Sequence, residues 1–195
     1  MNKKYKKYKF PDIDVYRFEF FLLDSNMYFL YENESALIVD PHLSDDLILL
    51  LEEKKIKDVT VLLTHEHPVH TSGVNYIQKN YKTCIICEEN CSESISEEKN
   101  NRPTLISFIL SEKDKLEGTD ILSKVPMYYR PYICKADIIF KEKLKYTWNK
   151  HDLIFFHTPG HSKGSVCITL DDFFVFTGDS LCENLPVITR FKGVR

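Results

Sequence analysis

The amino-acid sequence predicts an α/β sandwich, in which two β-rich halves are covered by helices. Strand-like segments dominate both ends of the chain, and helical patterns lie between them. No repeat, low-complexity tract or linker divides the 195 residues. We therefore expect a single domain over residues 1–195, with a flexible, lysine-rich N-terminus over residues 1–10.

The composition is that of an ordinary globular protein and excludes several classes. Hydrophobic residues make up 43% of the chain and charged residues 28%, which excludes disorder and coiled coil as descriptions of the whole. The formal net charge of -3 gives no general attraction to nucleic acid or to an anionic membrane. No apolar run approaches the roughly 20 residues that a membrane span requires. We therefore expect neither nucleic acid nor a membrane as a partner.

The N-terminus and the cysteines indicate a reducing compartment. No apolar stretch with a small-residue cleavage site follows the basic start, so we expect no secretion signal and a cytoplasmic location. Free thiols are then the default for the six cysteines. Cys84, Cys87 and Cys91 have a spacing that suggests metal ligation. However, the segment from Cys84 to Cys87 is typical of a short strand, which would send its two thiols to opposite faces.

The first part of the chain predicts strands and one helix. The helix is indicated by Ser44 as its N-cap, acidic residues in its first turn and lysines in its last. The third strand is a short apolar run that ends at Asp40 and Pro41. The predicted strands cover residues 14–22, 27–31, 35–39 and 58–64.

The middle of the chain is less regular, and strands return after it. Residues 88–102 are polar and predict helix or loop, and residues 108–131 mix apolar residues with prolines. Tyr128, Tyr129 and Tyr132 are expected to pack in the core rather than to line a substrate groove. The later strands are predicted at residues 136–140, 144–148, 153–157, 166–170 and 173–177, with Asp171 and Asp172 in a hairpin turn.

Three of the seven histidines lie directly after the predicted strand 58–64. In an extended segment His65 and His67 share a face, so both side chains can bind one metal ion. His70 lies near the start of a helix that Val74 and Ile77 continue. Imidazole ligands at the end of a strand suit zinc or iron.

Two later loops carry further candidate ligands. A strand ends at His157, a Pro-Gly pair turns the chain, and His161 is presented on the loop. The strand 173–177 is followed by Gly178 and Asp179, a carboxylate beside a residue that lets the backbone turn. We expect the three loops to bring their ligands to one edge of the sandwich.

The three loops, in this order and spacing, resemble the metallo-β-lactamase superfamily, whose motifs are H-x-H-x-D-H, a G-H loop and a G-D loop. The stretches H-T-P-G-H-S-x-G-S and F-T-G-D-S-L are most similar to the glyoxalase II-like branch. The resemblance spans residues 27–181 and implies a four-layer αββα sandwich, here shortened at the C-terminus. It also implies a reaction in which a metal-bound water attacks an ester, thioester, amide or phosphoester.

This resemblance assigns roles to five residues. His65, His67 and His161 match the three histidines of the first metal site. His70 matches a ligand of the second site. Asp179 matches the carboxylate that bridges both metals and takes part in catalysis.

The sequence departs from the family pattern at two points. Val69 stands where the family has Asp, and valine can neither bind a cation nor accept a proton. Glu66 is a nearby carboxylate, but it should point away from the ligands on either side of it. No histidine follows His161, so the last ligand of the second site is missing. We therefore expect one metal ion per chain, zinc rather than iron, because a catalytic zinc needs only three protein ligands and a water.

Three functions remain open. The first is hydrolysis of a small ester or thioester substrate through a metal-bound water. The second is oxidation of a thiol or persulfide by a single iron, for which His65, His161 and Asp179 form a two-histidine, one-carboxylate set. The third is a degenerate, non-catalytic protein that binds a metal or a partner. The short C-terminus also predicts an uncovered edge or face and therefore a homodimer.

The remaining polar residues near these motifs are expected to be structural. A hydrogen bond that holds the loop is predicted for His157, and similar bonds to loop backbone for Ser162 and Ser165. His42 is expected in a loop and His151 at the surface.

Overall fold

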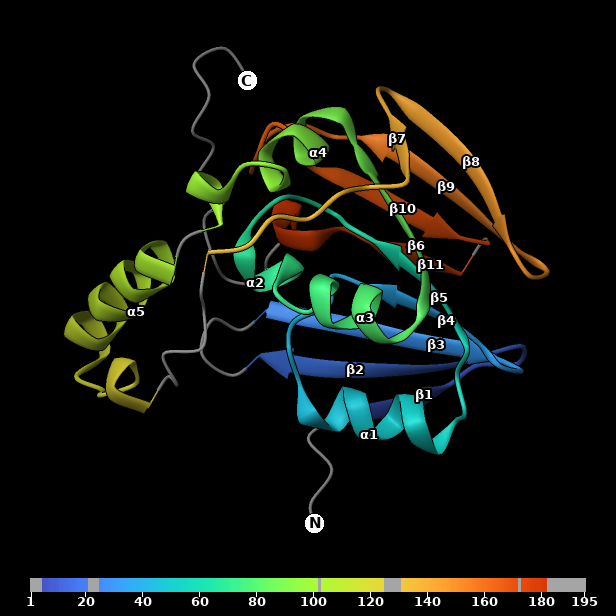
Figure 1. Cartoon of the computed structure of the whole chain (residues 1–195), viewed down its shortest axis with the longest axis horizontal. Coiled ribbons are helices and arrows are strands. Elements are labelled where there is room, and N and C mark those ends of the chain that lie inside the picture. Colours follow the sequence, from blue (N-terminus) through green and yellow to red (C-terminus); the bar gives the residue numbers. More distant parts are fainter. Residues whose placement is uncertain (1–4, 21–24, 102, 125–130, 172, 182–195) are drawn as a thin grey trace.

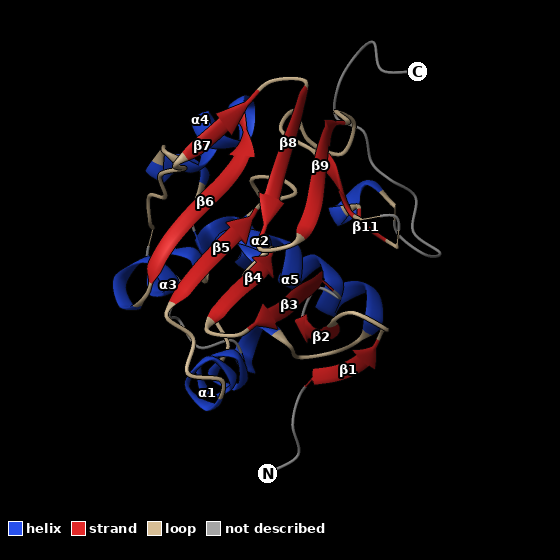
Figure 2. Cartoon of the chain, turned by 90° about the vertical axis from the view of Figure 1, so that its right-hand side faces the viewer, coloured by secondary structure: helices blue, strands red, loops and turns tan. Residues whose placement is uncertain are grey.

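The computed structural model describes residues 5–20, 25–101, 103–124, 131–171 and 173–181. Their strands form two sheets that pack face to face (Figures 1 and 2). The first sheet has seven strands in chain order, antiparallel from β1 to β4 and parallel from β4 to β7. They are β1 (Tyr5–Lys9), β2 (Asp14–Phe20), β3 (Ser25–Glu32), β4 (Ser35–Val39), β5 (Asp58–Leu62), β6 (Lys82–Glu88) and β7 (Ile138–Phe140).

The second sheet has four antiparallel strands in the order β11-β10-β9-β8. They are β8 (Lys143–Trp148), β9 (His151–His157), β10 (Val166–Leu170) and β11 (Phe174–Phe176). The helices are α1 (Asp45–Glu53), α2 (Pro68–Thr71), α3 (Val74–Asn80), α4 (Glu89–Ile95) and α5 (Pro103–Glu117), with short 3-10 turns η1 (Glu98–Asn100), η2 (Leu122–Lys124) and η3 (Gly178–Ser180).

Two buried clusters hold the layers together. The alternation of side chains along β5 sends Val59 and Val61 to one cluster and Leu62 to the other. The first cluster lies between the seven-stranded sheet and helices α1, α3 and α4. The second cluster lies between the two sheets. Cys87 belongs to the first cluster and Cys84 packs against the second, which confirms that their thiols face opposite ways.

Helix α1 begins where the sequence predicts. The Ser44 hydroxyl accepts a hydrogen bond from the Leu47 amide at 3.4 Å, and Asp45 and Asp46 lie in the first turn. Its apolar side is covered by the sheet, where Leu47, Leu50 and Leu51 are buried. On the second sheet, by contrast, Phe156 and Val175 point away from the inter-sheet cluster and are 36% and 60% exposed.

Two details differ from the expectations, and one expectation lies partly outside the described residues. Residues 5–9 of the expected flexible N-terminus form strand β1, which pairs with β2 and packs Tyr5 against Tyr16 and Phe18. His151 is buried rather than at the surface, because its pairing with Trp148 places its ring under the indole. Tyr128 and Tyr129 lie outside the described residues. No described helix is long and apolar enough to cross a membrane.

Candidate metal centre

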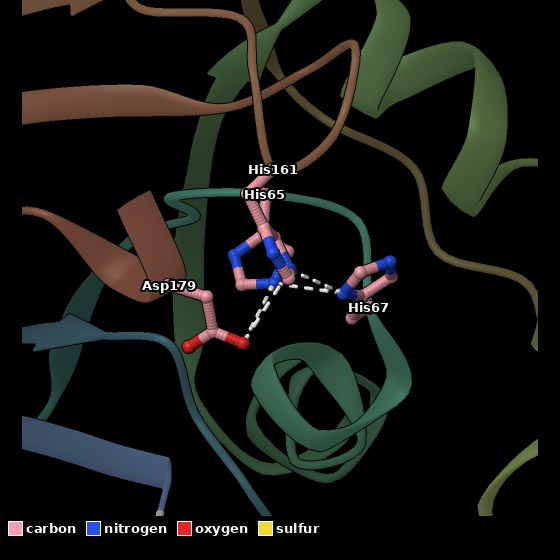
Figure 3. A group of neighbouring side chains, drawn as sticks. All are labelled: His65, His67, His161 and Asp179. Carbon is pink, nitrogen blue, oxygen red and sulfur yellow. Dashed lines mark hydrogen bonds and ion pairs between the residues drawn. The ribbon is translucent and has the colours of Figure 1, made fainter. Parts of the chain in front are cut away.

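The predicted ligand loops meet at one edge of the sandwich, at the carboxyl ends of strands from both sheets. His65 and His67 follow β5, His161 follows β9, and Asp179 lies in η3 directly after β11. Parallel strands end at the same edge of a sheet, and the face-to-face packing brings the ends of β9 and β11 to that edge. Figure 3 shows the four side chains pointing toward one another from three separate loops.

Three imidazole nitrogens converge within hydrogen-bond distance. His67 Nδ1 lies 3.1 Å from His65 Nε2 and 2.9 Å from His161 Nε2. Asp179 Oδ2 lies 3.4 Å from the same nitrogen of His161 and 3.7 Å from that of His65. The ligand atoms of these four residues all lie within 4.8 Å of one another. A tetrahedral zinc ion with Zn–N bonds of about 2.0 Å holds its ligand atoms about 3.3 Å apart, so the cluster has the required size.

The hydrogen bonds behind His65 fix which of its nitrogens faces the cluster. The Thr64 hydroxyl donates to Asp40 Oδ2 at 2.5 Å, so its oxygen is left to accept from His65 Nδ1 at 3.0 Å. His65 Nδ1 therefore carries the proton, and the unprotonated Nε2 faces His67 and Asp179. This is the arrangement of a metal-binding histidine whose second nitrogen is held by the protein.

His70 lies between two carboxylates, those of Asp40 and Asp179. Its Nδ1 is 3.0 Å from Asp40 Oδ2, and its Nε2 is 3.3 Å from Asp179 Oδ1. His70 Nε2 is buried and forms no well-aligned hydrogen bond. With Asp40 and His65 it forms a second, fully buried group whose ligand atoms lie within 4.8 Å. His70 is thus adjacent to the four-residue cluster, and Asp179 connects the two groups.

Burial and neighbouring charges shift the pKa values of His65 and His70 in opposite directions. Burial lowers the pKa of His65 well below its ordinary value, and the neighbouring histidines lower it further. Burial would also lower the pKa of His70, but the carboxylates of Asp40 and Asp179 outweigh it and raise this pKa to about 9. In the metal-free protein at neutral pH, His65 is therefore neutral and His70 is protonated.

Gly178 allows the Asp179 loop to approach the histidines. Its φ of 50° lies in the left-handed region. A Cβ at this position would collide with the Thr64 hydroxyl and lie 3.2 Å from His65 Nδ1. Glycine is therefore required for the position of Asp179.

The donor set fits a metal ion. His67 Nδ1 lies about 3 Å from a nitrogen of each of the other two histidines, and a carboxylate lies beside all three. Such a set of donor atoms is typical of a zinc or iron site. Val69 lies in α2 and adds no donor atom. The Glu66 carboxylate accepts a hydrogen bond from the Ser162 hydroxyl at 2.8 Å, so it does not substitute for the missing Asp.

The other histidines lie outside the cluster. His157 Nε2 donates to the Lys163 carbonyl at 2.8 Å, which confirms its predicted structural role. His42 is buried in its loop against Phe20, and burial lowers its pKa to about 4. His151 Nδ1 is 2.7 Å from Asp171 Oδ2, at the far end of β9.

Asp40 is the site residue that sequence reasoning missed. It accepts hydrogen bonds from the Thr64 amide at 2.7 Å and from the Thr64 hydroxyl, and it holds His70. The signal was present, because Asp40 ends an apolar strand that neighbours the strand before His65. Two adjacent parallel strands with polar residues at their carboxyl ends predict that those residues meet.

Replacing Gly178 by Ala should destabilise the protein by about 1–3 kcal/mol, because the positive φ and the contact with Thr64 both become unfavourable. Zinc affinity should fall with it, because Asp179 is displaced. Gly160→Ala is the matched control, since nothing lies within 4 Å of a Cβ there. Urea unfolding and chelator competition would measure both effects. Equal behaviour of the two variants would contradict the role given to Gly178.

In the presence of chelator, stability should fall as the pH rises from 6.5 to 9. The folded-state pKa of His70 is raised to about 9, so its contribution is complete below pH 6.5 and is lost as the pH rises through 9. The steepest slope should approach about 1.4 kcal/mol per pH unit. His65 and His42 have lowered pKa values in the folded protein, so they affect stability only below pH 6.5. There the folded state becomes less stable as the pH falls.

Urea unfolding at several pH values, with His70→Gln as the control, would measure this dependence. The control should lose the decline above pH 6.5. A wild-type stability that is constant or rises from pH 6.5 to 9 would contradict the protonation state given to His70.

Comparison with known proteins supports the resemblance. The metallo-beta-lactamase superfamily model matches residues 21–193. Hydroxyacylglutathione hydrolase from Buchnera aphidicola subsp. Schizaphis graminum is 32% identical over 123 residues, which cover 61% of this chain and 49% of that protein. The probable metallo-hydrolase YqgX from Bacillus subtilis is 26% identical over 163 residues, which cover 83% of this chain and 68% of that protein. The chain spans about half the length of the hydroxyacylglutathione hydrolases that it matches.

Solved structures share the fold. The BLEG-1 B3 metallo-beta-lactamase aligns with a TM-score of 0.61 at 22% identity, covering 92% of this chain and 73% of that one. ETHE1 from Myxococcus xanthus aligns with a TM-score of 0.57 at 16% identity, covering 86% of this chain and 57% of that one. The family model, the fold and the curated relatives agree: the chain belongs to the metallo-β-lactamase superfamily, in its glyoxalase II-like branch.

Proposed function

We propose that the protein is a metal-dependent hydrolase of a small thioester or ester, with one zinc ion per chain. The observation that carries the proposal is the convergence of three imidazole nitrogens and Asp179 at one point. The ligands in this proposal are His65, His67, His161 and Asp179. The ion would polarise the carbonyl of the substrate and lower the pKa of a bound water toward ~7.

The chain's own residues orient the ligands and the attacking water. The Thr64 hydroxyl holds His65 so that Nε2 faces the ion. His70 Nε2 forms an ion pair with Asp179 Oδ1 at 3.3 Å, which leaves Oδ2 facing the imidazole nitrogens. With Val69 in place of the family's Asp, Asp179 is the carboxylate beside the proposed ion. We assign to Asp179 the orientation of the attacking water, which would bind the ion next to Asp179 Oδ2.

The proton on His70 favours a single ion. His70 Nε2 would have to release its proton to bind a second metal, and the raised pKa of His70 makes this release unfavourable at neutral pH. Val69 supplies no ligand to compensate. Both features support one ion rather than two.

A thioester is the substrate class that the relatives support. Four of the curated relatives are hydroxyacylglutathione hydrolases, whose name describes an acyl group on the thiol of glutathione. This chain covers at most half of each of them. The acyl group and the thiol of its own substrate are therefore to be found by screening a panel of thioesters and esters.

Elemental analysis of protein purified without added metal should find one zinc per chain. His65→Ala and His161→Ala should each lose it, because each removes one of three imidazole ligands. His151→Ala is the matched control and should keep the ion, since His151 lies at the opposite end of β9. The loaded wild type should hydrolyse at least one thioester in the panel.

The alternatives give different results in the same experiment. If the protein instead holds one iron per chain and consumes oxygen in the presence of a persulfide, its function is thiol or persulfide oxidation and not hydrolysis. If the folded protein holds no metal, the non-catalytic binding function is favoured.

Val69→Asp should raise the metal content from one ion per chain to two and increase turnover by about 10²-fold or more, because a carboxylate there can bind metal and accept a proton. Val69→Asn has nearly the same shape without the charge and should leave both quantities near wild type. Two ions in the wild type would contradict the mononuclear site.

A further inference from the structure

Glu66 lies between two proposed metal ligands in the sequence but faces the other way. His65 and His67 turn toward the cluster, whereas Glu66, between them in the loop from β5 to α2, turns toward Ser162. Glu66 Oε2 accepts a hydrogen bond from the Ser162 hydroxyl at 2.8 Å. The Gly164 amide donates to the same carboxylate. The hydrogen bonds of Glu66 therefore run to the loop that carries His161.

A buried pair of serines fixes which group donates and which accepts in this hydrogen bond. Ser162 and Ser165 are only 4% and 2% exposed. The Ser162 amide donates to Ser165 Oγ at 3.0 Å, and the two hydroxyl oxygens lie 2.9 Å apart. Because an ionised carboxylate only accepts, the Ser162 hydroxyl donates to Glu66 and accepts from the Ser165 hydroxyl. Each hydroxyl hydrogen then has one assigned partner.

The two ligand loops are thereby joined at two points. At their base, the Val166 amide donates to the Thr64 carbonyl at 2.8 Å. Near the ligands, Glu66 binds Ser162, the residue after His161. Going outward from this base along the two loops, the Glu66–Ser162 contact comes next, directly before His67 and His161, whose Nδ1 and Nε2 atoms are 2.9 Å apart.

Helix α4 supports the same loop from behind. A Cβ on Gly164 would lie 2.5 Å from the Cys91 amide nitrogen, so the loop packs directly on the start of this helix. The Cys91 amide donates to Glu88 Oε2 at 3.2 Å, which fixes the surface on which Gly164 rests. The loop of His161 thus lies between α4 and Glu66.

We propose that Glu66 is a positioning residue that sets the separation of His67 and His161 through Ser162, and so determines the affinity and geometry of the metal site. The proposal rests on the proposed metal site. Glu66 does not touch the ion or the substrate in this account. It acts by connecting the loop that follows β5 to the loop between β9 and β10, next to the ligands that these loops carry.

Cobalt(II) binding to the metal-free full chain tests the proposal without an activity assay. Titration with cobalt(II) gives a dissociation constant, and the visible absorption bands report the ligand geometry. Glu66→Ala and Ser162→Ala should each weaken binding by about 10-fold or more and alter the bands, as losses of outer hydrogen-bond partners do. The double variant Glu66→Ala/Ser162→Ala should bind cobalt(II) about as weakly as each single variant, because each single substitution already removes the same hydrogen bond.

Two control variants separate positioning from general stability. Glu66→Gln keeps an oxygen that accepts from Ser162 and should bind cobalt(II) within about threefold of wild type. Asp171→Ala removes a carboxylate that accepts from the Asp152 amide at 2.8 Å at the far end of β9 and β10. It should lower the unfolding temperature and leave the cobalt spectrum unchanged.

Three outcomes would overturn the proposal. Wild-type affinity and bands in Glu66→Ala and Ser162→Ala would show that the connection does not set the geometry. Additive losses in the double variant would show that the two residues act separately. An equal loss in Asp171→Ala would show that stability alone explains the effect. If the wild type binds no cobalt(II), the proposed metal site fails as well, which distinguishes the two failures.

Discussion

The buried carboxylate of Asp40 is the constraint on which the rest of the site depends. It lies at the end of β4 and binds the amide and hydroxyl of Thr64 at the end of β5, so it fixes the start of the first ligand loop. Through the Thr64 hydroxyl it decides which nitrogen of His65 faces the cluster. Through His70 it also fixes Asp179. One side chain that touches no proposed ion therefore orients two of the proposed ligands, His65 and Asp179.

The fold and the main cluster could be predicted from the sequence because each rests on short-range patterns. The apolar run before His65 predicts a buried strand, and alternation then places His65 and His67 on one face. The buried His151 was not predicted, because its burial depends on stacking under Trp148 and on Asp171, which lies after the next strand. Strand β1 was missed for a similar reason. Its five residues are mostly exposed, and pairing with β2 rather than burial gives it order.

The outer connections of the site need the three-dimensional structure. Asp40 and Thr64 are 24 residues apart, and Glu66 and Ser162 are 96 apart. Both contacts join loops whose relative register depends on how two sheets pack, which no local pattern encodes. The same packing explains why Val69 leaves the first ligand set in place. Asp40 acts on His65 through Thr64, and Glu66 connects to the loop of His161, and neither contact involves Val69.

X-ray absorption at the zinc edge of the loaded protein tests the central claim most directly. We predict three imidazole nitrogens at about 2.0 Å, with oxygen from Asp179 or water completing the coordination shell. We also predict no second metal. A sulfur ligand at about 2.3 Å would place the ion at the cysteines instead. A metal neighbour at about 3.5 Å would show a two-ion centre and contradict the mononuclear site.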